Sequence, residues 1–182
     1  EAQVPGTKIP PPEIYDPAPF EATVRAVRGA TAIPIIGKLS AIFHLTTLKW
    51  VEAGIRGGLD AIEVADTLGP VMLIDIETGQ PKLGGPRGFG GLSGTALKPL
   101  TLRMVFEIAQ KFDIPIIGSG GIMGWKDAVE YAMAGARMFG VCTVGHLKGA
   151  EAYTKLIRDF GRYLDEKGTT LEGIRGLALR KV

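Results

Sequence analysis

The stretch that decides the fold is Ile114-Pro-Ile-Ile-Gly-Ser-Gly-Gly-Ile122, and a helix-like pattern follows it at 125–136. The isoleucines at 114, 116 and 117 form a continuous apolar run, which is typical of a buried parallel strand. Glycines just past a strand let the backbone approach a ligand and direct its N–H groups at an anion. Strand, glycine turn and helix therefore predict a phosphate site, although a tight turn without a ligand gives the same pattern.

The same alternation of strand and helix runs through the rest of the chain. Apolar runs predict further strands at 33–38, 59–65 and 137–141. Apolar residues at intervals of three and four predict helices at 16–29, 45–56, 98–112 and 150–167, and a short closing helix at 171–179. Strands that alternate with helices in this way pair in parallel, through right-handed crossovers.

Two parallel architectures compete for this pattern. An open doubly wound sheet calls for a GxGxxG turn after its first strand, and the sequence has none. A (β/α)8 barrel needs about 250 residues, so a chain of 182 residues holds about half of one. The residues at the strand ends favour the half barrel, because barrel chemistry collects there.

The composition is that of an ordinary globular protein with one domain, 1–182. Apolar residues make up 46% and charged residues 22%, with a net charge of +2 and no basic block interleaved with aromatics, which argues against nucleic-acid binding. No apolar run approaches the length of a membrane span. Cys142 is the only cysteine, so we expect no intrachain disulfide and a reducing, cytoplasmic location. The chain opens with Glu1 rather than Met, which indicates processing or a longer parent protein.

Two segments read as loops. Residues 1–16 are rich in proline and should be extended. Residues 67–97 are rich in glycine and proline, and loops this long inside a compact domain are usually functional. We therefore expect 67–97 to be an active-site loop.

The predicted strands are followed by one cation, one carboxylate, hydroxyls and two glycine clusters. If the strand ends meet at one rim of a barrel, these groups suit an anionic cofactor with a phosphate tail. Each also has a simpler interpretation. Lys38 could be a solvated lysine, Asp66 could cap a turn, and Cys142 could be a small buried hydrophobe. His44 and His146 lack the spacing of metal ligands, so no metal site is predicted.

Two motifs resemble a known family. The run Gly88-Phe-Gly-Gly-Leu-Ser-Gly-Thr-Ala-Leu-Lys-Pro-Leu-Thr-Leu102, followed by the glycine turn at 114–122, is similar to dihydroorotate dehydrogenases and to the pyrimidine-reducing domain of dihydropyrimidine dehydrogenases. The resemblance runs from about residue 4 to about residue 165 and implies an FMN-dependent (β/α)8 barrel. It covers only strands five to eight, so it implies that a separate chain or segment supplies the first four.

The resemblance also implies roles for individual residues. Lys38 corresponds to the lysine that reaches the polar edge of the flavin ring, and Gly90-Gly91 to the pair that packs against the flavin and its ribityl chain. The phosphate would be bound by the Gly120-Gly121 amides, with Gly118 in the same cofactor site, and by a second turn at Cys142-Thr143.

The substrate side departs from the family pattern. Glu1 falls where the family has its catalytic Cys or Ser, and Gln3 falls on a substrate asparagine. The family's later Asn-Ser or Asn-Thr pair is Asp66-Thr67 here, and an ionised Asp only accepts hydrogen bonds. A carboxylate also repels an anionic substrate such as dihydroorotate. We therefore expect Glu1 and Lys38 as catalytic groups, Gln3, Asp66 and Thr67 as substrate contacts, and a substrate other than dihydroorotate.

Three functions remain open from the sequence. The first is an FMN-dependent oxidoreductase that transfers hydride between flavin and a C–C bond next to a carbonyl, in an oligomer with an electron-transfer subunit. The second is a non-catalytic FMN- or phosphate-binding subunit that supports a partner chain. The third is a phosphate-binding barrel for a sugar phosphate, which Lys38 and the Gly90–Gly94 segment fit less well.

Overall fold

The computed structural model describes residues 16–181. Its main element is a parallel sheet whose strands follow the order β1-β2-β5-β6. These strands are β1 (Ile36–Leu39), β2 (Ala61–Val64), β5 (Ile116–Ser119) and β6 (Met138–Gly140). All four predicted strands are thus present. β2 and β6 lie inside their predicted ranges, whereas β1 ends one residue later than predicted and β5 continues to Ser119, into the predicted glycine turn.

Helices connect these strands and end where the sequence supplies a stop. They are α1 (Ala18–Ala30), α2 (Thr47–Gly57), α3 (Lys98–Lys111), α4 (Trp125–Ala134), α5 (Thr143–Lys148), α6 (Glu151–Glu166) and α7 (Leu171–Ile174). Short 3₁₀ turns lie at Ala41–Phe43, Pro86–Gly88, Gly94–Ala96 and Leu177–Lys181. Gly58 ends α2 and Gly135 ends α4, both in the left-handed conformation that glycine adopts without steric cost. The helix predicted at 171–179 is two short pieces, because Gly176 takes a positive φ between them.

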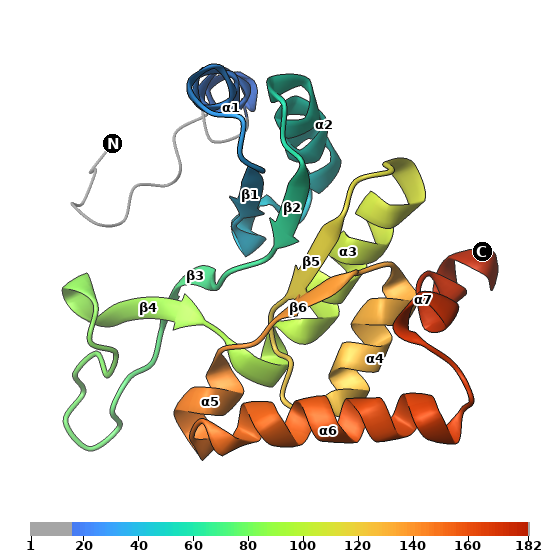
Figure 1. Ribbon diagram of the computed structural model, residues 1–182. Helices are drawn as coiled ribbons and strands as arrows, with labels where there is room; N and C mark the ends of the chain where they lie inside the picture. Colours follow the sequence, from blue (N-terminus) through green and yellow to red (C-terminus); the bar gives the residue numbers. More distant parts are fainter. Residues whose placement is uncertain (1–15, 182) are drawn as a thin grey trace.

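One face of the sheet carries the core. Leu39, Ile62, Val64 and Ile116 point at the helices and are almost fully buried. Figure 1 shows α2, α3 and α4 along this outer side of the curved sheet. Full burial of an aliphatic side chain contributes about 1.5–3 kcal/mol, so this layer holds the strands and helices together.

The opposite, inner face of the sheet is open. Ile36 on β1 and Met138 on β6 project from it and are 52% and 62% exposed. Within residues 16–181, β1 and β6 each pair on one side only, so the sheet has two free edges and does not close into a barrel. A parallel sheet is normally covered on both faces, and no helix of residues 16–181 covers this one.

The segment 67–97 was predicted as a loop, but it also contains regular structure. It contains an antiparallel pair of strands, β3 (Leu68–Met72) and β4 (Phe89–Leu92), which extends from the body of the protein in Figure 1. Glycines are unusual in strands, but here they allow close contact between neighbouring segments. A Cβ on Gly91 would lie 2.5 Å from the Thr67 hydroxyl oxygen, so only glycine lets β4 run beside Thr67.

The described part of the chain has no helix with both the length and the apolar character needed to cross a lipid bilayer.

Candidate functional site

A cavity of about 520 Å³ lies at the carboxyl ends of the four parallel strands. It is within the size range of ligand pockets, and the ends of parallel strands are where α/β proteins bind ligands. Its lining combines charged groups, hydroxyls and the glycine turn after β5. The residues concerned are Lys38, Asp66, Thr67, Ser93, Gly94, Ser119, Gly120, Gly121, Cys142, Thr143 and His146.

The structure brings most of the predicted site residues together, but not all of them. Gly90 and Gly91 line a neighbouring cavity of about 350 Å³, whose wall also includes Asp66 and Thr67. Gly118 lines neither. A Cβ there would lie 2.6 Å from the Tyr131 ring, so Gly118 allows α4 to pack on the sheet. The catalytic and substrate roles predicted for residues 1 and 3 lie outside the described residues.

The turn after β5 is oriented from behind by Tyr131. This side chain is fully buried, and its hydroxyl donates to the carbonyl oxygens of Gly120 at 2.7 Å and Ser119 at 3.2 Å. In a planar trans peptide the N–H points opposite to the C=O. The Ser119 carbonyl also accepts from the Ala65 N–H, directly after β2, at 2.9 Å, so it is shared between the sheet and Tyr131. The Gly120 carbonyl is held toward the helix layer, and the Gly121 N–H in the same peptide therefore points away from that layer. Burial raises the pKa of Tyr131 to about 12, so the phenol keeps its proton.

The second turn, after β6, is oriented in the same way. The Tyr153 hydroxyl donates to the Cys142 carbonyl oxygen at 3.3 Å, and the Gly145 N–H donates to it at 2.9 Å. The N–H of Thr143, in the same peptide, therefore points the other way. Gly145 makes room for this contact, because a Cβ there would overlap the Tyr153 hydroxyl. Two tyrosines thus fix two backbone turns that border one cavity.

The far end of the first turn is held by Asp127 on α4. One carboxylate oxygen accepts from the backbone N–H groups of Met123 and Gly124, at 2.9 and 3.0 Å. The other accepts from the Lys98 ammonium at 2.7 Å, and Glu130 binds the same ammonium at 2.9 Å. Burial opposes the charge on Lys98, but the two carboxylates outweigh it and raise the pKa of the ammonium group.

Lys38 reaches the cavity from β1 and has an ionic partner on the next strand. Its ammonium nitrogen lies 3.0 Å from a Glu63 carboxylate oxygen. Neither the tyrosines nor Glu63 stood out in the sequence. The only signal for Glu63 was strand alternation, which gives it the same face as Lys38 once the two strands are in register.

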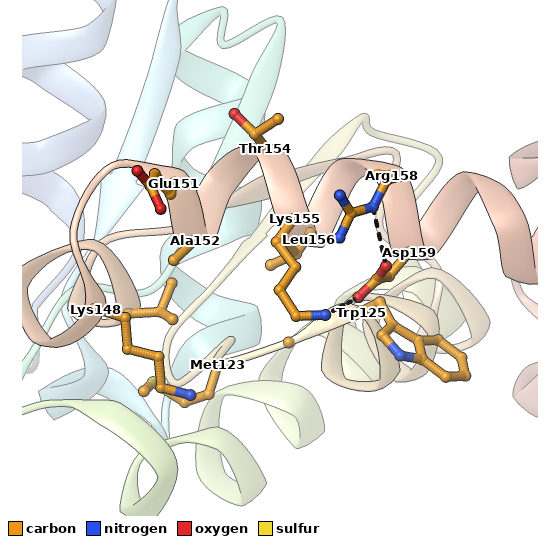
Figure 2. Close-up of a pocket in the computed structure, with 12 residues that line it drawn as sticks. Met123, Trp125, Lys148, Glu151, Ala152, Thr154, Lys155, Leu156, Arg158 and Asp159 are labelled. Carbon is orange, nitrogen blue, oxygen red and sulfur yellow. Dashed lines mark hydrogen bonds and ion pairs between the residues drawn. The ribbon is translucent and has the colours of Figure 1, made fainter.

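A further cavity, of about 590 Å³, lies between α6 and the start of α4. Figure 2 shows that Lys155 and Arg158 in its lining are directed at the carboxylate of Asp159. The turn at Met123 and Gly124 and the helix α5 separate this cavity from the strand ends. In residues 16–181 we find no group of three histidine, cysteine or acidic side chains placed to hold a metal ion.

The fold and the cavity define a class: parallel α/β proteins with a ligand site at the carboxyl ends of the strands and backbone amides turned into it. Within that class the family model for dihydroorotate dehydrogenase matches residues 13–164. The chain therefore belongs to the dihydroorotate dehydrogenase family, whose members are FMN-dependent oxidoreductases that act on CH–CH bonds.

Similar proteins carry the name dihydroorotate dehydrogenase B (NAD(+)), catalytic subunit. The protein of Pyrococcus horikoshii is 37% identical over 166 residues, which are 91% of this chain and 54% of that protein. The protein of Desulforudis audaxviator is 40% identical over 84% of this chain and 48% of its own length. That of Thermococcus kodakarensis is 40% identical over 87% and 51%. The chain thus spans about half the length of these relatives.

Proposed function

We propose that the chain forms the FMN-binding part of an oxidoreductase that transfers hydride between flavin and a C–C bond next to a carbonyl. The observation that carries this proposal is the pair of backbone turns, each held from behind by a tyrosine, on the cavity that Lys38 enters. Amides turned into a cavity bind a phosphate group well, and a lysine at the same rim stabilises negative charge.

The residues present fit the cofactor. The N–H groups of Gly120 and Gly121 supply donors for the phosphate, and the Thr143 N–H adds one from the second turn. Lys38 supplies the cation for the polar edge of the flavin ring. Gly90 and Gly91 leave room beside Asp66 and Thr67 for the rest of the molecule. FMN, when bound, supplies the hydride chemistry that amino-acid side chains lack.

We propose that the chain is one domain that contributes strands five to eight of a (β/α)8 barrel, with a partner chain or segment contributing the other four. Three findings support this assignment: the free edges of β1 and β6, the bare inner face with Ile36 and Met138, and the coverage of about half of each relative. In that barrel 67–97 borders the active site, since Asp66 and Thr67 lead into it and Gly90 and Gly91 return beside them.

The names of the relatives support a partner for electron transfer. They are called catalytic subunits of an NAD(+)-linked enzyme, and a catalytic subunit implies at least one other subunit. We therefore propose that the active assembly is an oligomer in which another subunit connects the flavin with NAD(+).

The charge at the cavity favours a substrate other than dihydroorotate. Asp66 lies at the wall shared by both cavities, and Glu63 is the register partner of Lys38 on the neighbouring strand. The Asp66 carboxylate repels an anion at close range, and the pairing of Lys38 with Glu63 offsets part of the nearby positive charge. We propose a neutral substrate that contacts Asp66 and Thr67. Glu1 as base and Gln3 as a further contact remain part of this proposal.

The test uses the assembly purified with its partner. The visible spectrum should show bound flavin, and one member of a panel of neutral dihydropyrimidines should bleach it with a primary isotope effect. An assembly without flavin, before or after FMN is added, contradicts the proposal. Flavin that no substrate reduces supports the second candidate, a non-catalytic FMN-binding subunit, which Asp66 in place of the family's asparagine favours.

A further inference from the structure

Glu63 and Lys38 are direct neighbours on the inner face of the sheet. They are register partners on β2 and β1, and both side chains point away from the helix layer. The Lys38 ammonium lies 3.0 Å from the Glu63 carboxylate, and the two side chains are 51% and 21% exposed. The carboxylate is thus the more buried partner, and it is the fixed end of the pair.

The carboxylate leans toward the strand ends that border the cavity. A Cβ on Gly140, at the end of β6, would lie 3.2 Å from the same Glu63 oxygen and 2.7 Å from the Ser119 hydroxyl. Gly140 and Ser119 both line the cavity, whereas Glu63 does not. The oxygen that binds Lys38 therefore sits at the cavity wall, and it draws the ammonium from β1 across to β5 and β6.

The rest of this row of the sheet is apolar. Ile117 and Met138 continue the register from Glu63 toward the other edge. A carboxylate beside apolar side chains depends on its one nearby cation, because an unpaired charge in such surroundings is costly. The half-buried carboxylate therefore restrains Lys38, although the exposed ammonium remains in contact with water.

We propose that Glu63 is a positioning residue, which holds the Lys38 ammonium at the cavity wall beside the ends of β5 and β6. This inference depends on the proposed function only for its effect on flavin. A lone lysine there would favour negative charge on bound FMN. Because Glu63 holds the ammonium at the wall, the reduction potential of the flavin stays lower than an unrestrained Lys38 would set it.

The first test is a cycle of Glu63→Gln, Lys38→Met and the double variant in the FMN-loaded assembly, with the reduction potential as the readout. Glu63→Gln should raise the potential, and Lys38→Met should lower it. If Glu63 acts through Lys38, the upward shift should largely disappear in the Lys38→Met background. An equal shift in both backgrounds would mean direct action on the flavin and would overturn the proposal.

The second test needs no flavin. The assembly is treated briefly with an acylating reagent, and the modification rates of Lys38 and Lys49 are compared by mass spectrometry. Lys49 is an exposed helix lysine and serves as the internal control. Glu63→Gln should raise the Lys38 rate several-fold and leave the Lys49 rate unchanged, because the released amine is no longer held by a carboxylate. An unchanged Lys38 rate refutes the ion pair, whereas an assembly that lacks FMN refutes only the proposed function.

Discussion

The phenolic oxygen of Tyr131 lies 2.7 Å from the carbonyl oxygen of Gly120, and this contact decides which way the glycine turn presents its amides. The tyrosine is fully buried and also contacts the Thr101 hydroxyl. A single helix residue thus determines the donors available at the strand ends, although it does not itself line the cavity.

Tyr131→Phe should loosen this turn without changing the shape of the core. The variant leaves the part-buried Gly120 carbonyl with only the long Thr101 contact at 3.4 Å, which costs about 1–3 kcal/mol. We expect lower stability in chemical unfolding and a several-fold weaker Kd for FMN in the assembly. Tyr163→Phe is the matched control, because the Tyr163 ring packs on Trp125, beyond the Ser119–Gly121 part of the turn. An unchanged Kd in Tyr131→Phe would show that the hydroxyl does not orient the amides.

Gly121 should tolerate no side chain. Its φ is +72°, and a Cβ would lie 2.5 Å from the Gly94 carbonyl oxygen. Gly121→Ala should therefore lower stability by about 1–3 kcal/mol and reduce the flavin content of the purified assembly. Gly161→Ala is the control of opposite sign, because Gly161 lies inside α6 with open space around it and alanine there should add about 0.5–1 kcal/mol. Full flavin loading of Gly121→Ala would contradict the proposed role of the turn.

The sequence predicted the strands and the glycine turns well, since both depend on local patterns. The continuous apolar run at Ile114–Ile117 and the glycines after it are enough to place a buried strand and a close approach. The groups that orient the turn could not be found in this way. Tyr131 reads as an ordinary core residue of a helix, and only the packing of α4 on the sheet brings its hydroxyl to Gly120.

The hairpin of β3 and β4 was missed for a related reason. Glycine is rare in strands, so Gly90 and Gly91 favoured a loop prediction. Their role depends on the chain passing close to Thr67, a contact between segments that no local pattern encodes. Glu63 was missed because only the register of β1 and β2 places it beside Lys38, and no local sequence pattern encodes that register.

Asp127→Asn should weaken the other end of the turn. The carboxylate accepts from two backbone amides and from Lys98, and hydrogen bonds to a charged group contribute about 1.5–3 kcal/mol each. We expect a loss of stability in that range for the set as a whole and weaker FMN binding. Glu130→Gln removes the second partner of the same lysine, and since Glu130 is 47% exposed, its effect should stay below about 1 kcal/mol and shrink with added salt. Equal effects of the two variants would mean that Asp127 acts only as a charge for Lys98.

The acid side of the stability curve should depend on Asp159, which lies on the wall of the cavity in Figure 2. The hydrogen bond from Lys155 is the largest cause that holds the pKa of Asp159 below its ordinary value of 3.8, and Arg158 adds to it. The folded protein therefore takes up this proton at lower pH than the unfolded chain. The stabilisation is complete above pH 3.8 and is lost as the pH falls through the folded pKa.

Asp159→Asn removes this titration. Unfolding free energies of the assembly, measured from about pH 5 to about pH 2, should fall less steeply with decreasing pH in the variant than in the parent. Asp165→Asn changes an exposed aspartate on the same helix and should keep the parent's slope. Parallel curves for the parent and Asp159→Asn would mean that the carboxylate has the same proton affinity in the folded and unfolded chain, and the cluster around it would then stabilise α6 through packing alone.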